Sequence, residues 1–423
     1  MERGQRSLTD DCALLPLRTT NHALRTMQIN EAYLVASVRT PVGKAKKGAL
    51  KDVRPEHLGA AAINGAMARV PGLEHAMIDD VVIGCAYPEG PQGNNMARAI
   101  AQIAKMPDSV PGVTVNRFCS AGVQTIAQAY NSIAMGQADV IVAGGVESMS
   151  SVPMGGFYFA PDPALTADDP EFYTSMGITA ENVADKYNVS REDQDAFAVQ
   201  SHQRAADAIA NGRFDDELVP VEVEETVYDP ETKEAVTRTF THDTDEGPRP
   251  DTSVEALARL RPVFKNGGSV TAGNASQMND GAAATILMSK ARVDELEVEP
   301  MAKMLGFAVA GVAPELMGIG PMESIPKVLK QVGMSLDDID LLELNEAFAS
   351  QSLAILRELN ISQDKVNVKG GAIAPGHPLG CTGAKLTATL LHEMGRRGSR
   401  YGIVTMCIGG GMGASAVFEN LRR

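Results

Sequence analysis

Short apolar runs rich in β-branched residues alternate along the chain with alanine-rich segments. The runs at residues 81–84, 140–143 and 402–405 have the length and composition of buried strands. Another strand-like run lies at residues 31–38, and residues 121–135 have the alanine-rich composition of a helix. Alternation of this kind predicts an α/β fold with mostly buried strands.

The order of these segments repeats in the two halves of the chain. In the first half, a strand-like run at residues 113–116 precedes Cys119 and a helix that begins near Gly122. In the second half, a strand-like run at residues 366–368 precedes His377 in the same way. We therefore expect two similar α/β halves that face each other, with Cys119 and His377 at equivalent turns.

A segment of different character separates the halves. Residues 151–271 are first rich in helix formers and then charged and β-branched, which favours an inserted lid or loop domain. We accordingly divide the chain into an N-terminal half at residues 27–290, which contains the insert, and a C-terminal half at residues 291–423. Residues 1–26 have neither a periodic apolar pattern nor a signal-peptide core, so we expect a disordered appendage.

Composition and charge narrow the class of protein. The chain has 423 residues, of which 44% are hydrophobic and 22% charged, as in a packed globular enzyme. A net charge of -15 argues against a general nucleic-acid or membrane-surface binder, and no apolar run has the length of a membrane span. Five scattered cysteines form no disulfide framework, so a reducing, cytoplasmic compartment fits best. No ligand spacing typical of zinc is present, and we expect no metal.

Cys119 is the leading candidate for a catalytic nucleophile. It follows a strand and precedes an alanine-rich helix, which places its sulfur at a helix N-terminus. There the helix dipole and free N–H groups favour the thiolate, and Gly122 allows a substrate to approach closely. The alternative is a small buried residue at a strand-to-helix turn.

His377 is the candidate base. It lies in a loop of sequence GHPLGCTGA at residues 376–384, where a proline and three glycines predict a tightly turned backbone. A lone histidine is more often structural, and we interpret His202 on a predicted helix in that way. The position of His377 opposite Cys119 instead favours a base.

Two further residues end strands of the second half. Cys407 precedes a glycine run whose N–H groups suit an anion or oxyanion, although a buried cysteine before a structural turn has the same pattern. The run loosely matches a dinucleotide fingerprint, but too few residues follow it for the required helix and acidic residue. Asn345, where a strand passes into a helix, either caps that helix or positions a water.

Four blocks of sequence together resemble the thiolase family. They are VNRFCSAG at residues 115–122, NEAFA at residues 345–349, the histidine loop at residues 376–384 and CIGGGMG at residues 407–413. GGVESMS at residues 144–150 adds a further block. The resemblance runs from about Met27 to Arg422 in the family's order and spacing. It implies the thiolase fold, a duplicated five-layered αβαβα architecture with an inserted loop domain.

The resemblance implies a role for each candidate in the reaction. Cys119 would carry the acyl group as a thioester, His377 would accept its proton, and Cys407 would act as the acid and base at the substrate α-carbon. His377 and a water held by Asn345 would form one oxyanion hole. The backbone N–H groups of Cys119 and Gly409 would form another.

Coenzyme A is implied as a cosubstrate, with no cofactor bound permanently. Ser276 would contact it, Arg249 would lie near the nucleotide phosphates, and Met176 and Phe348 would lie beside its reactive end. The implied reaction is reversible, ping-pong thiolytic cleavage of 3-ketoacyl-CoA to acetyl-CoA and a shortened acyl-CoA, as in fatty-acid β-oxidation. Acetoacetyl-CoA thiolases usually have histidine directly before this methionine, so Ser175 favours the 3-ketoacyl branch.

Alternatives remain at this point. An acetoacetyl-CoA thiolase, which is an acetyl-CoA C-acetyltransferase, is the alternative within the family. A decarboxylating ketosynthase shares the fold but typically relies on two histidines or on histidine and asparagine, which Cys407 disfavours. A non-catalytic acyl-CoA or lipid carrier would be expected to lack a reactive residue, and none is missing. The resemblance implies a homodimer or homotetramer and is compatible with a subunit of a β-oxidation complex.

Overall fold

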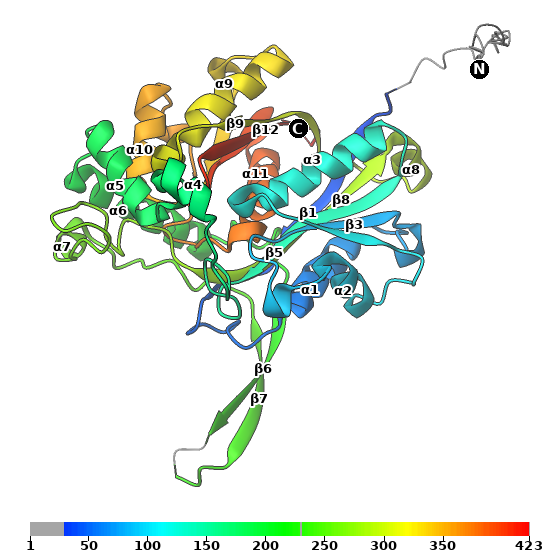
Figure 1. Ribbon diagram of the computed structural model, residues 1–423. Coiled ribbons are helices and arrows are strands. Elements are labelled where there is room, and N and C mark those ends of the chain that lie inside the picture. The colour runs from blue at the N-terminus through cyan, green and yellow to red at the C-terminus, as the bar shows by residue number, and fades with distance from the viewer. Residues whose placement is uncertain (1–28, 229–230, 423) are drawn as a thin grey trace, which may run out of the picture.

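The computed structural model describes residues 29–228 and 231–422, whose arrangement is shown in Figure 1. The appendage predicted at residues 1–26 lies outside the described residues.

Five principal strands of the first half form one side of a mixed sheet. They are β1 (Ala32–Arg39), β3 (Asp80–Gly84), β4 (Gly112–Val115), β5 (Val140–Ser148) and β8 (Asn279–Ser289). Their spatial order is β4-β3-β5-β8-β1, and the short β2 (Gly43–Lys44) pairs with β8. β3 is parallel to both of its neighbours, β4 and β5, whereas β5 pairs antiparallel with β8. The apolar runs predicted at residues 81–84 and 140–143 are thus confirmed as buried strands.

The second half repeats this arrangement except for a counterpart of β4: the strand predicted at residues 366–368 is wrong, since Val366 forms only an isolated bridge with Leu342. Its strands are β9 (Ala302–Gly311), β10 (Leu341–Leu344), β11 (Tyr401–Ile408) and β12 (Met412–Asn420), in the spatial order β10-β11-β12-β9. β10 and β11 are parallel, as β3 and β5 are. The two sets of strands join where Leu34 of β1 pairs with Ala302 of β9. The predicted duplication is therefore visible in the strand order.

Helices divide the molecule into five layers (Figure 1). α3 (Ala121–Ala134) and α11 (Leu379–Arg397) pack against each other between the two sets of strands. α1 (Pro55–Met67) and α2 (Met96–Ile103) cover the outer face of the first set. α9 (Gly320–Val332) and α10 (Ala349–Glu358) cover the second set, and the small α8 (Lys290–Glu295) follows β8. Apolar clusters fill the outer and central interfaces, so burial holds the layers together.

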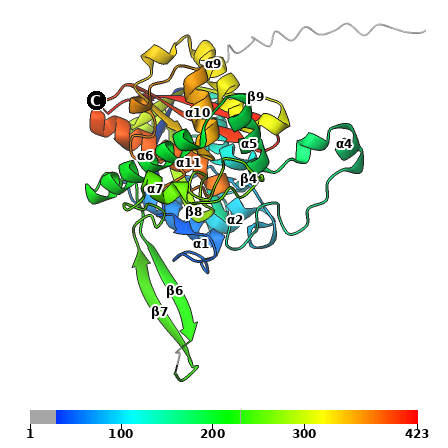
Figure 2. The same ribbon diagram turned by 90° about the vertical axis from the view of Figure 1, so that its left-hand side faces the viewer.

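The segment between the halves forms its own small elements. It contains the helices α4 (Pro163–Asp168), α5 (Met176–Lys186), α6 (Arg191–Ala210) and α7 (Val254–Ala258), and the strands β6 (Val221–Tyr228) and β7 (Ala235–His242). β6 and β7 pair only with each other and project from the body as an arm (Figures 1 and 2). Figure 2 also shows α4 and its flanking segments extending away from the body.

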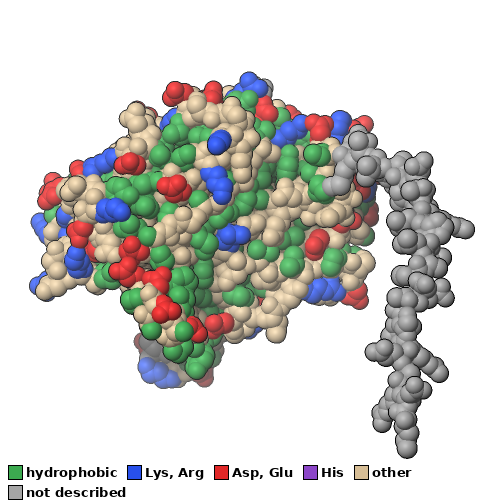
Figure 3. Space-filling model, turned by 45° about the horizontal axis from the view of Figure 1, so that its top comes forward, with side chains coloured by type: hydrophobic (Ala, Val, Ile, Leu, Met, Phe, Trp, Pro, Cys, Tyr) green, Lys and Arg blue, Asp and Glu red, His purple; other side chains and the backbone are tan. Residues whose placement is uncertain are grey.

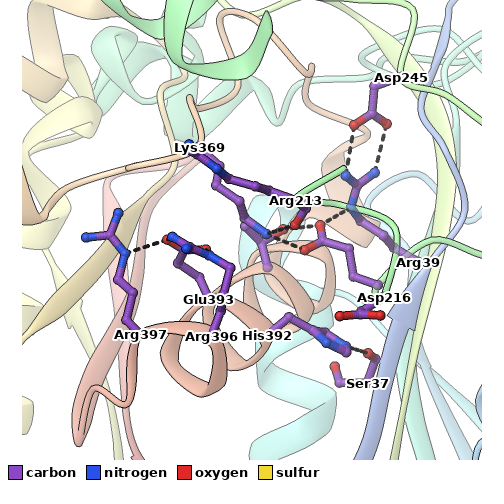
Figure 4. Close-up of polar contacts among 12 residues, drawn as sticks. Ser37, Arg39, Arg213, Asp216, Asp245, Lys369, His392, Glu393, Arg396 and Arg397 are labelled. Atoms are coloured by element: carbon purple, nitrogen blue, oxygen red, sulfur yellow. Dashed lines mark hydrogen bonds and ion pairs between the residues drawn. The ribbon is translucent and has the colours of Figure 1, made fainter. Parts of the chain in front are cut away.

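A buried ion cluster that includes Arg39, Asp245 and Lys369 links the two halves (Figure 4). Arg39 of β1 donates hydrogen bonds to both carboxylate oxygens of Asp245, at 2.7 and 2.8 Å. It also pairs with Glu217 at 2.6 Å, and Glu217 in turn pairs with Lys369 of the second half at 2.7 Å. Each of these charges therefore has an opposite partner, as buried charges require.

The surface carries charges of both signs. On the face shown in Figure 3, acidic and basic side chains are distributed among apolar and uncharged polar ones. No helix of the described residues combines the length and hydropathy that crossing a membrane requires.

Candidate active site

Cys119 lies in a single 3-10 turn, Phe118–Ser120, that leads directly into α3. The preceding residue, Phe118, has a φ of 43°, a conformation that a bulky side chain seldom adopts. Asn116 stabilises it, because its side-chain oxygen accepts a hydrogen bond from the Phe118 N–H at 2.8 Å and its amide donates to the Ala86 carbonyl. The Cys119 sulfur that follows this strained turn accepts a hydrogen bond from the backbone N–H of Gly409 in the second half.

His377 lies just before α11, the helix that corresponds to α3 in the second half. Its backbone N–H donates to the Asn279 side-chain oxygen at 3.0 Å, and its ring is held at both nitrogens. The Asn345 amide lies 3.3 Å from Nε2, and the Thr382 hydroxyl lies 2.6 Å from Nδ1. The ring is buried and its orientation is therefore determined by neighbouring residues.

These partners determine which ring nitrogen carries the proton. The Thr382 hydroxyl donates its hydrogen to the Pro378 carbonyl at 3.0 Å, so it can only accept from His377 Nδ1. The Asn345 amide nitrogen is a donor, so Nε2 must be the acceptor. Nε2 consequently keeps a lone pair and is suited to accept a proton.

Burial governs the protonation of the cysteine and the histidine. Burial raises the pKa of Cys119 to about 12, although the backbone N–H groups of Gly409 and of Cys119 itself act in the opposite direction. The expectation that a helix N-terminus makes the thiolate abundant is therefore wrong for the resting site, because desolvation outweighs the dipole. Burial, and next the charge of Lys385, lower the pKa of His377 to about 3. The pair rests as a neutral thiol and a neutral imidazole.

Asn345 directly follows β10 and does not cap the following helix. Its backbone N–H donates to the Thr405 carbonyl at 2.9 Å, and α10 begins only at Ala349, with Phe348 at the N-cap. The capping interpretation of Asn345 is thus wrong, because two residues lie between it and the N-cap Phe348. Its side-chain oxygen is buried and has no hydrogen-bond partner among the described residues. An acceptor in that position is consistent with the alternative of positioning a water.

Cys407 and Gly409 lie at the end of β11 and in the turn that follows. Cys407 is buried, and its thiol lies 3.8 Å from the Gln351 side-chain oxygen. Burial, and next the nearby Cys119 sulfur, raise the pKa of Cys407 well above its ordinary value. The Gly409 N–H points toward the Cys119 sulfur from the opposite half. The end of β11 and the turn that follows thus bring a second thiol and a backbone donor to Cys119.

Two adjoining cavities meet at Cys119. The first, of about 400 Å³, is lined by Cys119, His377 and Cys407 together with Ser276, Met176 and Phe348. The second, of about 460 Å³, extends from Cys119 past Gly409 toward the α4 segment. Arg249 lines neither cavity; its backbone N–H donates to the His202 ring at 3.2 Å. His202 is buried in that contact, as expected for a structural histidine.

Sequence reasoning overlooked two residues that support the site. Thr382 stood inside the histidine loop, and only the hydroxyl geometry reveals that it orients His377. Glu147, in the block at residues 144–150, accepts hydrogen bonds at 2.8 Å from the backbone N–H groups of Ala86 and Gly380. It joins the loop after β3 to the start of α11. The available signal in the sequence was the carboxylate of Glu147 among the mostly apolar positions of a predicted strand.

The fold and site together define a class of protein. A duplicated α/β fold brings a cysteine at the start of one helix, a neutral histidine at the start of its counterpart and a second cysteine to one cavity. This arrangement is suited to acyl transfer through a sulfur nucleophile.

Comparison with known proteins identifies the family. The family described as "Thiolase, N-terminal domain" matches residues 32–291, and "Thiolase, C-terminal domain" matches residues 298–420. The chain belongs to the thiolase family.

Named relatives support this membership. A 3-ketoacyl-CoA thiolase of Bacillus subtilis is 56% identical over 92% of this chain and 100% of its own length. A β-ketoadipyl-CoA thiolase of Pseudomonas aeruginosa is 44% identical over 92% of this chain and 99% of its own. The crystal structure of human mitochondrial 3-ketoacyl-CoA thiolase in complex with CoA is 38% identical, with a TM-score of 0.82 over 93% of this chain and 98% of that one. The predicted thiolase fold is confirmed.

Proposed function

We propose that this protein is an acetyl-CoA C-acyltransferase that cleaves 3-ketoacyl-CoA with coenzyme A, giving acetyl-CoA and a shortened acyl-CoA. The observation that carries the proposal is the convergence of Cys119, His377 and Cys407 on one cavity. The 56% identity with a protein named 3-ketoacyl-CoA thiolase supports the substrate class, as does Ser175 directly before Met176.

In the first half-reaction, Cys119 attacks the 3-keto carbonyl while His377 Nε2 takes its proton. A thiol and an imidazole that are both neutral at rest can exchange this proton as the sulfur approaches the carbon. The 3-keto oxygen becomes negative, and we assign its stabilisation to the backbone N–H groups of Cys119 and Gly409, whereas His377 and a water held by Asn345 stabilise the oxygen of the acetyl-CoA enolate. The bond between the α-carbon and the former carbonyl carbon then breaks, and Cys407 protonates the acetyl-CoA enolate.

In the second half-reaction, the Cys407 thiolate takes the proton of the incoming coenzyme A thiol. The coenzyme A sulfur attacks the thioester on Cys119, and the N–H groups of Cys119 and Gly409 stabilise the thioester oxyanion. The Cys119 sulfur leaves and recovers its proton from His377, so the enzyme returns to its starting state. The covalent thioester divides one difficult step into two.

Coenzyme A is the cosubstrate in this proposal, and no cofactor is held permanently. Ser276 and Phe348 would contact its reactive arm in the first cavity, and Met176 would lie where the two cavities meet. Arg249, outside the cavity lining, would reach only the nucleotide phosphates, which extend beyond it.

We propose a cytoplasmic homodimer or homotetramer. β4 ends the sheet, and its free outer edge leaves Val113 43% exposed, which supports pairing with a second copy. A role within a β-oxidation complex is a further proposal that follows from the same substrate class.

Trapping the acyl intermediate tests the proposed function. Wild-type protein and Cys119→Ala are incubated with 3-ketooctanoyl-CoA without added coenzyme A, and peptides are analysed by mass spectrometry. We expect a hexanoyl adduct on Cys119 in the wild type only, with unchanged circular dichroism of the variant. An adduct on another residue, or full thiolysis by Cys119→Ala, would contradict the proposal.

A further inference from the structure

The second thiol of the site, Cys407, has a polar partner that the proposed reaction steps do not use. Cys407 packs among buried apolar side chains, and among the described residues its thiol donates to one side-chain acceptor, Gln351 Oε1, at 3.8 Å. The Cys407 sulfur itself accepts a hydrogen bond from the Cys407 backbone N–H. Gln351 is fully buried and lines neither of the two cavities. It therefore contacts the thiol from the protein interior and not from the space that the substrate occupies.

Hydrogen bonds with two neighbours determine which end of the Gln351 amide faces the thiol. The amide Nε2 donates to the Ser352 hydroxyl at 3.1 Å, and that hydroxyl donates its own hydrogen to the Phe348 carbonyl at 3.1 Å. The Ser352 oxygen can therefore only accept from Gln351. The Phe348 backbone N–H donates to Gln351 Oε1 at 3.4 Å, and it would repel an amide N–H group in that position. The oxygen is therefore the end of the amide that faces Cys407.

Packing holds the Gln351 side chain in this position. A Cβ atom on Gly318 would lie 2.7 Å from the Gln351 Cβ, so the two residues are in close contact. Gln351 lies in the first turn of α10, for which Phe348 is the N-cap. The amide thus belongs to a packed helix start, where a side chain has little freedom to move away from its partners.

An acceptor at this point separates the roles of the two thiols. Cys119 and Cys407 line the same cavity as His377, whose Nε2 can take one proton. A Cys407 hydrogen that is directed at Gln351 is not offered to Nε2, so this acceptor is left to the Cys119 hydrogen. A neutral oxygen beside the sulfur also favours the thiol over the thiolate. The thiolate, once it forms, is consequently a strong base toward a proton on carbon.

We propose that Gln351 is a positioning residue for Cys407 and that its side-chain oxygen holds the thiol hydrogen until the enolate forms. The proposal rests on the proposed function and adds a residue to its acid–base step at carbon. In cleavage, the hydrogen leaves Gln351 Oε1 and passes as a proton to the enolate carbon, and the electron pair of the S–H bond stays on sulfur. In the reverse direction, the Cys407 thiolate takes a proton from the α-carbon of acetyl-CoA, and the electron pair of the C–H bond stays in the enolate.

Acetyl-CoA allows the two thiols to be tested separately on the same protein. In deuterium oxide, exchange of the acetyl protons measures proton transfer between Cys407 and carbon. Transfer of the acetyl group from acetyl-CoA to isotope-labelled coenzyme A measures thioester formation on Cys119. His377 alone can complete this transfer, because the proton that it takes from Cys119 can pass to the leaving sulfur. A loss that is confined to proton exchange therefore identifies an effect on Cys407, which a general disturbance of the fold would not produce.

α10 provides a matched pair of substitutions beside Gln351. Ser352 and Ser350 are both fully buried, and their hydroxyls donate to the backbone carbonyls of Phe348 and Ala180 respectively. Of the two serines, Ser352 is the one that also accepts from the Gln351 amide. Ser352→Ala thus releases that amide, whereas Ser350→Ala leaves it in place. Gln351→Met keeps the length of the side chain and removes the acceptor.

We expect Gln351→Met to lose about tenfold in the rate of proton exchange and no more than about twofold in acetyl transfer, because one hydrogen bond to the reacting thiol is missing. Ser352→Ala should lose about fivefold in proton exchange, with acetyl transfer again within about twofold of the wild type. Ser350→Ala should stay within about twofold of the wild type in both reactions. All variants are compared as full-length proteins, with circular dichroism as the check on folding.

Several results would overturn the proposal. They are unchanged proton exchange in Gln351→Met, an equal fall of both reactions in that variant, or equal effects of the two serine substitutions. If Gln351→Met does not fold, unchanged proton exchange in Ser352→Ala overturns the proposal instead. A wild type that catalyses neither reaction would contradict the proposed function itself, so the two failures are distinguishable.

Discussion

At the scale of single residues, Cys119 and His377 form a pair that burial keeps neutral. Burial raises the pKa of the thiol to about 12 and lowers the pKa of the imidazole to about 3. Between those values neither group titrates alone, so the proposed reaction requires direct proton transfer between them. The orientation of the imidazole therefore matters as much as its pKa, and Thr382 sets that orientation through Nδ1.

Replacing Thr382 by valine tests this positioning role. Thr382→Val leaves the Nδ1–H of His377 without its acceptor, so the tautomer with a free Nε2 loses its preference. We expect kcat for thiolysis to fall roughly 10- to 100-fold with little change in KM, because substrate contacts persist. Steady-state kinetics with 3-ketooctanoyl-CoA measures both values.

Thr387→Val provides the control for this substitution. Thr387 is buried on the same helix, and its hydroxyl donates only to the Gly383 carbonyl, at 2.8 Å. If this variant lost as much kcat as Thr382→Val, a general effect on α11 would explain both, and Thr382 would have no special relation to His377.

At the scale of secondary-structure elements, the site depends on the close approach of α3 and α11. A Cβ atom on Gly122 would lie 2.5 Å from the Ala384 backbone nitrogen, and one on Gly383 would lie 2.4 Å from that of Val123. Glycine at both positions lets the helix backbones pack directly. Because Cys119 and His377 precede these helices by a few residues, the helix separation determines how near the two side chains come.

Gly122→Ala tests that dependence. The added methyl group meets backbone atoms rather than a movable side chain, so the helices must separate. We expect the free energy of unfolding to fall by about 1 to 3 kcal/mol and thiolysis to be largely lost. Gly395→Ala is the matched control, since a Cβ there has nothing within 4 Å. Urea unfolding of that variant should show unchanged or slightly higher stability, and a comparable loss would refute the packing argument.

At the scale of the whole molecule, the two halves are joined by buried charges as well as by apolar layers. Glu217 accepts hydrogen bonds from Arg39 of β1, from Lys369 in the segment before α11, and from Thr389 of α11. Burial alone would raise its pKa, but the charges of Lys369 and Arg39 outweigh burial and lower the pKa to about 2. The carboxylate is thus held ionised at the junction of three segments.

Glu217→Gln tests the contribution of this junction. The substitution removes the carboxylate that pairs with both Arg39 and Lys369, two buried cations. We therefore expect the free energy of unfolding at pH 7 to fall by about 3 to 5 kcal/mol. Glu295→Gln, which removes an exposed pair with Arg292, should cost less than about 1 kcal/mol. Urea titrations of both variants and the wild type measure these differences.

The pH dependence of this effect has a definite sign. The folded-state pKa of Glu217 lies below its ordinary value of 4.5, so its contribution is complete above 4.5 and is lost as pH falls toward 2. The deficit of Glu217→Gln should therefore be smaller at pH 4 than at pH 7, by about 1 kcal/mol. A deficit that grows on acidification would contradict the ion-pair explanation.

Sequence by itself determined the alternation of strands and helices, the duplication, and the placement of Cys119, His377 and Cys407 at strand or helix ends. Local periodicity and glycine positions carry that information, since they act within a few residues. The tautomer of His377 and the true start of α10 depended on contacts between residues distant in the chain or on exact turn geometry.

Tertiary structure alone decided the protonation of the site and the shape of its second cavity. The sequence shows that Cys119 precedes a helix, which predicts a lowered thiol pKa. It does not show how many layers of structure cover Cys119. Desolvation by those layers is the larger effect and raises the pKa. Likewise, Tyr87, Phe118 and Phe159 are separated along the chain and line one cavity only in the folded protein. Burial and long-range proximity are properties of the assembled layers, and no local pattern encodes them.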